Sequence, residues 1–183
     1  QSNATPVKNE LDALFQSTLD FYGKLQRTPN GLYRDAYHIH DSQRPNHFCS
    51  TAATGVGLMA LCMDHALGRD TAAQQKALQT LRAINGKCEG FKIGREKSGC
   101  FKHFFSSEGG LINAQYSTID TAIMVVGALY CRNTFDDPQI KAEADQLWNS
   151  IDWSVPLAEP TGRDLYMVLD DGTPLENKKT HLF

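Results

Sequence analysis

The chain has 183 residues, of which 41% are hydrophobic and 21% are charged, and its formal net charge is −3 at pH 7. It therefore holds enough apolar material for one core, and its small negative charge favours neither nucleic acid nor an anionic membrane as a partner. No apolar run approaches the roughly 20 residues that cross a bilayer, so we expect no membrane-spanning helix.

The chain begins with Gln1–Ala4, which resembles the remnant of a cleavable expression tag. We therefore expect the native sequence to start near Thr5 and treat 5–183 as one domain. The first predicted helix covers 8–26 and has one apolar stripe, which we expect to face the core while the opposite side meets water. The stripe comprises Leu11, Leu14, Phe15, Thr18, Tyr22 and Leu25.

Four further predicted helices alternate in character along the chain. The helix over 51–67 has almost no polar side, whereas 71–85 returns to a single apolar stripe. The helix over 117–133 is again apolar all round, and 138–151 is striped. The order outer, inner, outer, inner, outer predicts an all-α fold with two concentric layers, a partial α/α toroid of about five helices, rather than a four-helix bundle.

Two long connections, 27–50 and 86–116, each lead into the start of an inner helix, and we expect them to line one face of the domain. The runs Phe101–Phe105 and Leu165–Leu169 precede turn-forming residues. They predict short strands or β-hairpins that close over this face.

The five cysteines show no Cys-x-x-Cys spacing, so we predict neither a zinc site nor a disulfide framework. Cys88 and Cys100 flank a glycine-rich loop and either stay reduced or form one bridge in an oxidising compartment. No metal and no cofactor are expected, because the polar residues of the 38–47 loop lack ligand spacing. These residues are His38, His40, Asp41 and His47.

Asp120 stands out as a carboxylate in the first turn of an inner helix. Ser117 or Thr118 can accept hydrogen bonds from the first free N–H groups, and Asp120 lies at the position of a capping-box acid. One interpretation of Asp120 is therefore a helix cap. The other is an acid–base group at the mouth of a pocket, and the local pattern leaves both open.

Four segments, in order, resemble the glucoamylase-like α/α-toroid family, which includes bacterial β-1,2-glucanases and the related domain of cyclic β-glucan synthases. They are Gly31-Leu32-Tyr33-Arg34-Asp35, Ala53–Leu61, Phe101–Phe105 and Ser117-Thr118-Ile119-Asp120-Thr121-Ala122. The resemblance implies a glycoside hydrolase that acts on a glucan or oligosaccharide and is periplasmic or secreted. The family toroid has about twice this length, which implies that the chain is its N-terminal half.

Glycoside hydrolysis needs two carboxyl groups that flank the scissile bond. The resemblance suggests Asp35 and Asp120, because each lies before or at the start of an inner helix. Family members usually carry Glu at the position of Gln115, and an amide does not exchange protons at useful pH. A domain that binds sugar without cleaving it therefore remains a second hypothesis.

Substrate contacts are expected from residues near these acids. The guanidinium fork of arginine suits sugar hydroxyls, and aromatic rings stack against a pyranose. The candidates are Arg34, His103, Gln115, Tyr33, Tyr116 and Phe104. The alternatives are core packing for each aromatic residue and a surface ion pair or turn for Arg34 and Asp35.

A third hypothesis concerns the open ends of a half-ring. Such a fold exposes apolar helix flanks, so the chain is alternatively a helical interaction scaffold. It would complete its ring as a homodimer or with the missing half of a longer protein.

Overall fold

The computed structural model describes residues 4–37, 48–91, 93–108, 112, 114–157, 164–169 and 171–181, with backbone only at 4–7 and 175–181. Its helices lie close to the five predicted ranges, and the predicted all-α fold with short strands is confirmed. The helices are α1 (Ala4–Asp20), α2 (Thr51–Ala66), α3 (Ala73–Ile84), α4 (Thr118–Thr134) and α5 (Pro138–Asn149). A π-helical turn, η1 (Phe21–Gln26), continues α1. In the described part of the chain, no helix is long and apolar enough to span a membrane.

Side-chain caps fix where three of the helices begin. The Ser50 hydroxyl accepts a hydrogen bond from the Ala53 amide at the start of α2, and Ser117 does the same for Asp120 at the start of α4. Asp137 caps α5 and is followed by proline at the first helical position. Each cap satisfies donors that a helix N-terminus otherwise leaves unpaired.

The two inner helices, α2 and α4, form the centre of the molecule. A Cβ atom on Gly55 would lie 2.5 Å from the carbonyl oxygen of Ile123, so the two backbones touch. Further along, the Sγ atoms of Cys62 and Cys131 are 3.5 Å apart. The later residue of α2 contacts the later residue of α4, so the two helices run parallel. This is the direction expected of two inner helices that are joined through an outer helix.

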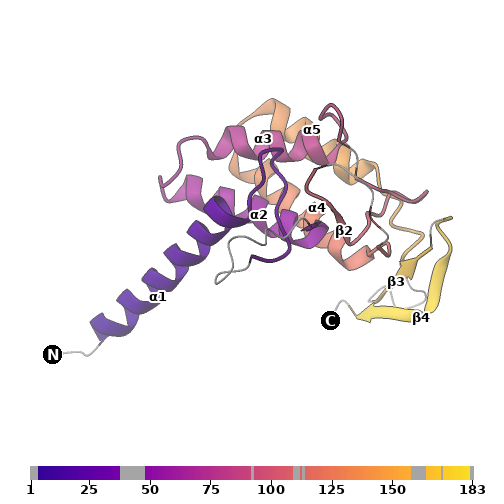
Figure 1. The fold of residues 1–183 in the computed structure, drawn as a ribbon, viewed down its shortest axis with the longest axis horizontal. Helices are drawn as coiled ribbons and strands as arrows, with labels where there is room; N and C mark the ends of the chain where they lie inside the picture. The colour runs from indigo at the N-terminus through magenta and orange to yellow at the C-terminus, as the bar shows by residue number, and fades with distance from the viewer. Residues whose placement is uncertain are drawn as a thin grey trace.

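The outer helices α3 and α5 cover α2 and α4 on one side (Figure 1). Their apolar stripes supply fully buried Leu81 and Leu147 to the core, as the periodicity predicts. The Lys87 ammonium, just after α3, lies 2.7 Å from a carboxylate oxygen of buried Glu143 in α5. This ion pair joins the two outer helices.

Helix α1 departs from the prediction. Its side chains from Lys8 to Thr18 are exposed, except for half-buried Gln16, and Figure 1 shows α1 projecting from the body. The predicted core-facing stripe is therefore wrong for the exposed Leu11, Leu14, Phe15, Thr18 and Leu25, and Tyr22 is half-buried. The amphipathic pattern was real, but the surface that would bury it does not lie within the described part of this chain.

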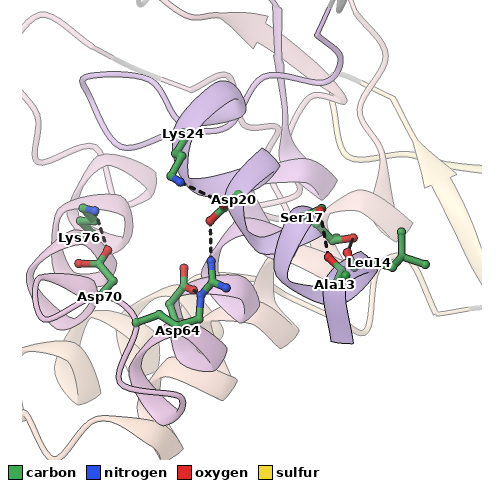
Figure 2. Close-up of polar contacts among 10 residues, drawn as sticks. Ala13, Leu14, Ser17, Asp20, Lys24, Asp64, Asp70 and Lys76 are labelled. Carbon is green, nitrogen blue, oxygen red and sulfur yellow. Dashed lines mark hydrogen bonds and ion pairs between the residues drawn. The ribbon is translucent and has the colours of Figure 1, made fainter. Parts of the chain in front are cut away.

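Ion pairs hold the base of α1. The Arg69 guanidinium lies between Asp20 at the end of α1 and Asp64 of α2, with 2.8 Å between Arg69 Nε and the Asp64 carboxylate. Lys24 lies 3.0 Å from the other oxygen of Asp20 (Figure 2). Asp64 is largely buried, so the inner helix carries one end of this clamp.

Four short strands form two antiparallel pairs: β1 (Phe48–Ser50) with β2 (Phe104–Ser106), and β3 (Asp164–Val168) with β4 (Pro174–His181). The β3–β4 hairpin confirms the prediction at Leu165–Leu169, and its turn contains Gly172 at φ 83°. The run Phe101–Phe105 leads into the short strand β2, as one of its two predicted forms, but β2 pairs with the distant β1 and not within a local hairpin. Buried Phe105 lies opposite buried Cys49, and this shared burial outweighs a local turn.

All five cysteines are free thiols, so no bridge joins Cys88 and Cys100. Cys100 is buried in the core, and burial raises the pKa of its thiol to about 11. Cys49, Cys62 and Cys131 are buried, as predicted for small core residues.

Candidate functional site

The two long connections meet at the starts of the inner helices. The Thr51 amide donates to the His103 carbonyl at 3.0 Å, and the His103 amide donates to the Gln115 carbonyl at 2.8 Å. The Ser117 amide donates to Phe101 at 2.9 Å. The segment 101–106 therefore links the N-terminus of α2 to that of α4, and the described parts of both connections meet there.

Asp120 lies at this junction, in the first turn of α4. Its backbone amide donates to the Ser117 hydroxyl at 3.3 Å, so Ser117 is the cap residue. The Asp120 carboxylate is therefore not needed for capping. Only 7% of the residue is exposed, at the N-terminal end of α4.

His103 is the polar neighbour of this carboxylate. The distance from His103 Nδ1 to Asp120 Oδ2 is 3.4 Å. The imidazole also stacks on Phe104, with 3.8 Å between ring centroids and 33° between the planes. Both rings are half-buried, so the histidine connects a buried acid to an accessible ring surface.

Gln115 and Tyr116 flank the same junction. Gln115 is exposed, while its carbonyl holds the His103 amide. Tyr116 is buried, and the Lys102 ammonium lies 5.4 Å from the centroid of its ring. The structure thus brings together five of the predicted site residues: Asp120, His103, Phe104, Gln115 and Tyr116.

Asp35 lies across the β1–β2 pair from Asp120. Its amide donates to the Phe48 carbonyl at 3.0 Å, on the edge of β1 away from β2. Strands lie about 4.8 Å apart, so roughly 10 Å separates the Asp35 backbone from β2. Asp35 is exposed on this far edge, and its pairing with Asp120 remains a prediction.

Tyr33 points to the interior rather than to this face, whereas Arg34 is half-buried. Tyr33 is 1% exposed, and a Cβ on Gly57 would lie 2.5 Å from its ring. Burial raises the pKa of the Tyr33 hydroxyl. Arg34 Nη1 donates to the Leu25 carbonyl at 3.3 Å. The expected stacking role does not fit Tyr33, because α2 covers its ring.

The histidines considered for metal binding, His38, His40 and His47, lie outside the described residues, as does Asp41. Among the described residues, no three His, Cys, Asp or Glu side chains gather as a metal site would require.

Comparison of the sequence with protein-family profiles and with curated proteins gives no match. The fold, in contrast, matches solved structures. An endo-β-1,2-glucanase from Chitinophaga pinensis, in complex with sophorotriose and glucose, aligns with a TM-score of 0.78 at 19% identity, over 97% of this chain and 44% of its own. This is the fold of a glucoamylase-like α/α toroid.

Two further toroids support the assignment of the fold. A protein from Bacteroides caccae, provisionally named a glucoamylase, aligns with a TM-score of 0.74 at 18% identity, over 93% of this chain and 43% of its own. A β-1,2-glucanase from Parabacteroides distasonis aligns with a TM-score of 0.73 at 21% identity, over 94% of this chain and 25% of its own. The chain therefore spans less than half the length of the toroids that it matches.

Proposed function

We propose that this chain binds a glucan or oligosaccharide over the starts of α2 and α4, and that Asp120 is the acid–base group of a glycoside hydrolase site there. One observation carries the proposal. Ser117 already caps α4, yet a buried carboxylate lies beside the cap and within 3.4 Å of a half-exposed imidazole. Because Ser117 supplies the cap, this carboxyl group beside an imidazole is a candidate for acid–base chemistry.

The surroundings of Asp120 suit a sugar. The stacked rings of His103 and Phe104 offer a face for a pyranose ring, and exposed Gln115 offers an amide for its hydroxyls. His103 orients the Asp120 carboxylate through Nδ1. The ionised carboxylate would serve as the base or nucleophile of the reaction, and the proton donor would be a second carboxyl group, for which Asp35 is our candidate.

The comparisons support a glucan as the substrate class. Two of the matching structures are named β-1,2-glucanases, and one of them was solved with sophorotriose and glucose. A shared fold does not fix the reaction, so the linkage has to come from experiment. A periplasmic or secreted location belongs to the same proposal and is tested by fractionation of the source cells.

The test compares Asp120→Asn with the unaltered chain. We expect the variant to keep its helix content and Tm, because the Ser117 cap is intact, and to lose release of reducing ends from β-1,2-glucan. Assays on β-1,3- and α-linked glucans define the linkage. Asp137→Asn is the matched control. Position 137 lies outside the site, and an asparagine there can still cap α5. Full activity of Asp120→Asn would refute the assigned role.

A sugar-binding domain without hydrolysis is the second candidate, favoured by the amide of Gln115 at the junction. It predicts that calorimetry detects glucan binding while no reducing ends appear. Asp120→Asn would then weaken binding rather than abolish turnover.

A further inference from the structure

Two cysteines that are 69 residues apart in the sequence meet between the inner helices. Cys62 lies near the end of α2 and Cys131 near the end of α4, with 3.5 Å between their Sγ atoms. Both residues are buried in the core, and they are 5% and 0% exposed. The candidate site uses neither thiol, so this pair is available for a separate role.

The helices are held close enough for the two sulfur atoms to bond. The backbones of α2 and α4 touch at Gly55 and Gly127, and Cys62 lies about two helical turns beyond Gly55. Cys131 Sγ also lies 3.6 Å from the Leu58 carbonyl oxygen, so its side chain is directed against α2. A disulfide bond is about 2.0 Å long, and small rotations about the two Cα–Cβ bonds would bring the sulfur atoms that close.

The other three cysteines have different surroundings. Cys49 lies in β1, before the start of α2, and the thiol of Cys100 lies 3.6 Å from the Ser98 hydroxyl. Cys88 is half-buried in the connection that follows α3. Of the thiol contacts in the described part of the chain, only that of Cys62 with Cys131 joins two sulfur atoms. The structure therefore favours a different pair from Cys88 and Cys100, which the sequence suggested.

We propose that Cys62 and Cys131 form a disulfide bond that joins α2 to α4 when the chain folds in an oxidising environment. The oxidant is a small disulfide, for which oxidised glutathione is the probe. The Cys62 thiolate attacks one sulfur of the probe and releases one glutathione. The Cys131 thiolate then attacks the Cys62 sulfur of the mixed disulfide and releases the second. Two protein thiols are oxidised, one small disulfide is reduced, and the two cysteine protons end on the two released thiols.

The bond would close a long loop that contains α3 and the connection from 86 to 116. A link of this kind stabilises the fold chiefly because it restricts the unfolded chain. Burial of both sulfur atoms would shield the bond from reductants once α2 and α4 have packed. Cys131 lies about three helical turns, or roughly 16 Å, beyond Asp120 in α4, so the bond leaves the candidate site unchanged.

The first test refolds the reduced, denatured chain in oxidised or reduced glutathione. It uses Cys88→Ser, which removes the half-buried thiol. Recovery of helix content is checked by circular dichroism, free thiols are alkylated, and peptides are mapped by mass spectrometry. We expect two free thiols, Cys49 and Cys100, and one peptide pair that joins Cys62 to Cys131. The Tm of the linked chain should exceed that of the reduced chain by roughly 4–16 °C.

Two matched controls are made in the same Cys88→Ser background. Cys49→Ala removes another buried thiol and should leave the bond intact. Cys131→Ala removes one partner and should give the same Tm in oxidised and reduced glutathione. Each variant is compared with itself under the two conditions, so any loss of stability from the substitution does not enter the comparison.

A second test requires no refolding. The native, reduced Cys88→Ser chain is held in the same glutathione buffers with urea below the unfolding transition, where local opening lets a small reagent reach buried groups. The bond between Cys62 and Cys131 should accumulate in oxidised glutathione and should be absent in reduced glutathione.

Three results would overturn the proposal: four free thiols in both tests, a bond between a different pair, or a linked chain whose Tm is no higher than that of the reduced chain. Asp120→Asn should form the same bond, and Cys131→Ala should leave any sugar release unchanged. This proposal and the glucan proposal therefore stand or fall separately.

Discussion

Gly127 of α4 lies directly against Gly55 of α2: a Cβ atom at position 127 would be 2.2 Å from the Gly55 carbonyl oxygen. Backbone occupies that space, so no side chain can rotate away to make room. We expect Gly127→Ala to push the inner helices apart and to lower the free energy of unfolding by about 1–3 kcal/mol, the usual cost of overpacking. That corresponds to a fall in Tm of roughly 2–12 °C, measured by calorimetry.

The control for this substitution is Gly23→Ala. A Cβ at Gly23 would meet no heavy atom within 4 Å, so this change should leave Tm unchanged or raise it slightly. Equal Tm values for Gly127→Ala and the unaltered chain would show that α2 and α4 are not in backbone contact.

The clamp at the base of α1 should weaken in acid. The hydrogen bond from Lys24 holds the pKa of Asp20 below its usual value of 3.8, and Arg69 acts in the same direction. A lowered folded-state pKa means that the clamp contributes fully above the unfolded pKa and is lost as the pH falls through the folded one. A pH titration of the Asp20 carboxyl carbon by NMR measures this pKa directly.

Lys24→Met should raise the pKa of Asp20 toward 3.8, because the first of its lowering contacts is removed. Lys8→Met is the matched control, since Lys8 lies about three helical turns from Asp20 in α1. An unchanged Asp20 pKa in Lys24→Met would contradict the geometry of the clamp.

His103→Phe tests the positioning of Asp120. The substitution keeps an aromatic ring against Phe104 but removes the nitrogen that lies 3.4 Å from the carboxylate. A hydrogen bond to a charged group is worth about 1.5–3 kcal/mol, so sugar release should fall by about ten- to hundredfold. Lys102→Met changes the neighbouring side chain without touching Asp120 and should retain activity. A His103→Phe variant with unaltered kcat/KM would remove His103 from the site.

Gln115→Glu restores an acid at the junction of the loops. If the amide limits hydrolysis, the variant should release more reducing ends than the unaltered chain, because a carboxyl group can donate a proton and an amide cannot. Gln75→Glu adds the same charge to an exposed position on α3 and should have no effect. Identical rates for all three chains would mean that position 115 supplies no proton.

Periodicity predicted the helices and their layers well, for a physical reason. The spacing of apolar residues along one helix shows which of its sides are buried. This spacing gave one buried side for α3 and α5 and burial nearly all round for α2 and α4. For α1, the same pattern correctly predicted an apolar side but not what lies against it. A stripe specifies that a surface is to be buried, and it does not specify whether the partner belongs to the same chain.

The arrangement of the candidate site residues could not be read from the sequence, because they are brought together by pairing between distant segments. Nothing near Phe104 in the sequence indicates that β2 pairs with β1, or that Asp35 lies on the edge of β1 away from β2. Tyr33 belongs to the core because Gly57 leaves space for its ring. A glycine in this helix signals close approach by a neighbour, but Gly55 and Gly57 look alike in the sequence, and only Gly57 receives the Tyr33 ring.

Because α2 packs against α4, α2 cannot bury its apolar surface until α4 has been synthesised. Translation must continue for 67 residues, from position 51 to position 118, before the first residue of α4 follows that of α2. At about 5–20 residues per second this takes roughly 3–13 s. During that interval the apolar surface of α2 is exposed without its main partner. A ribosome-associated chaperone would therefore be expected to bind α2.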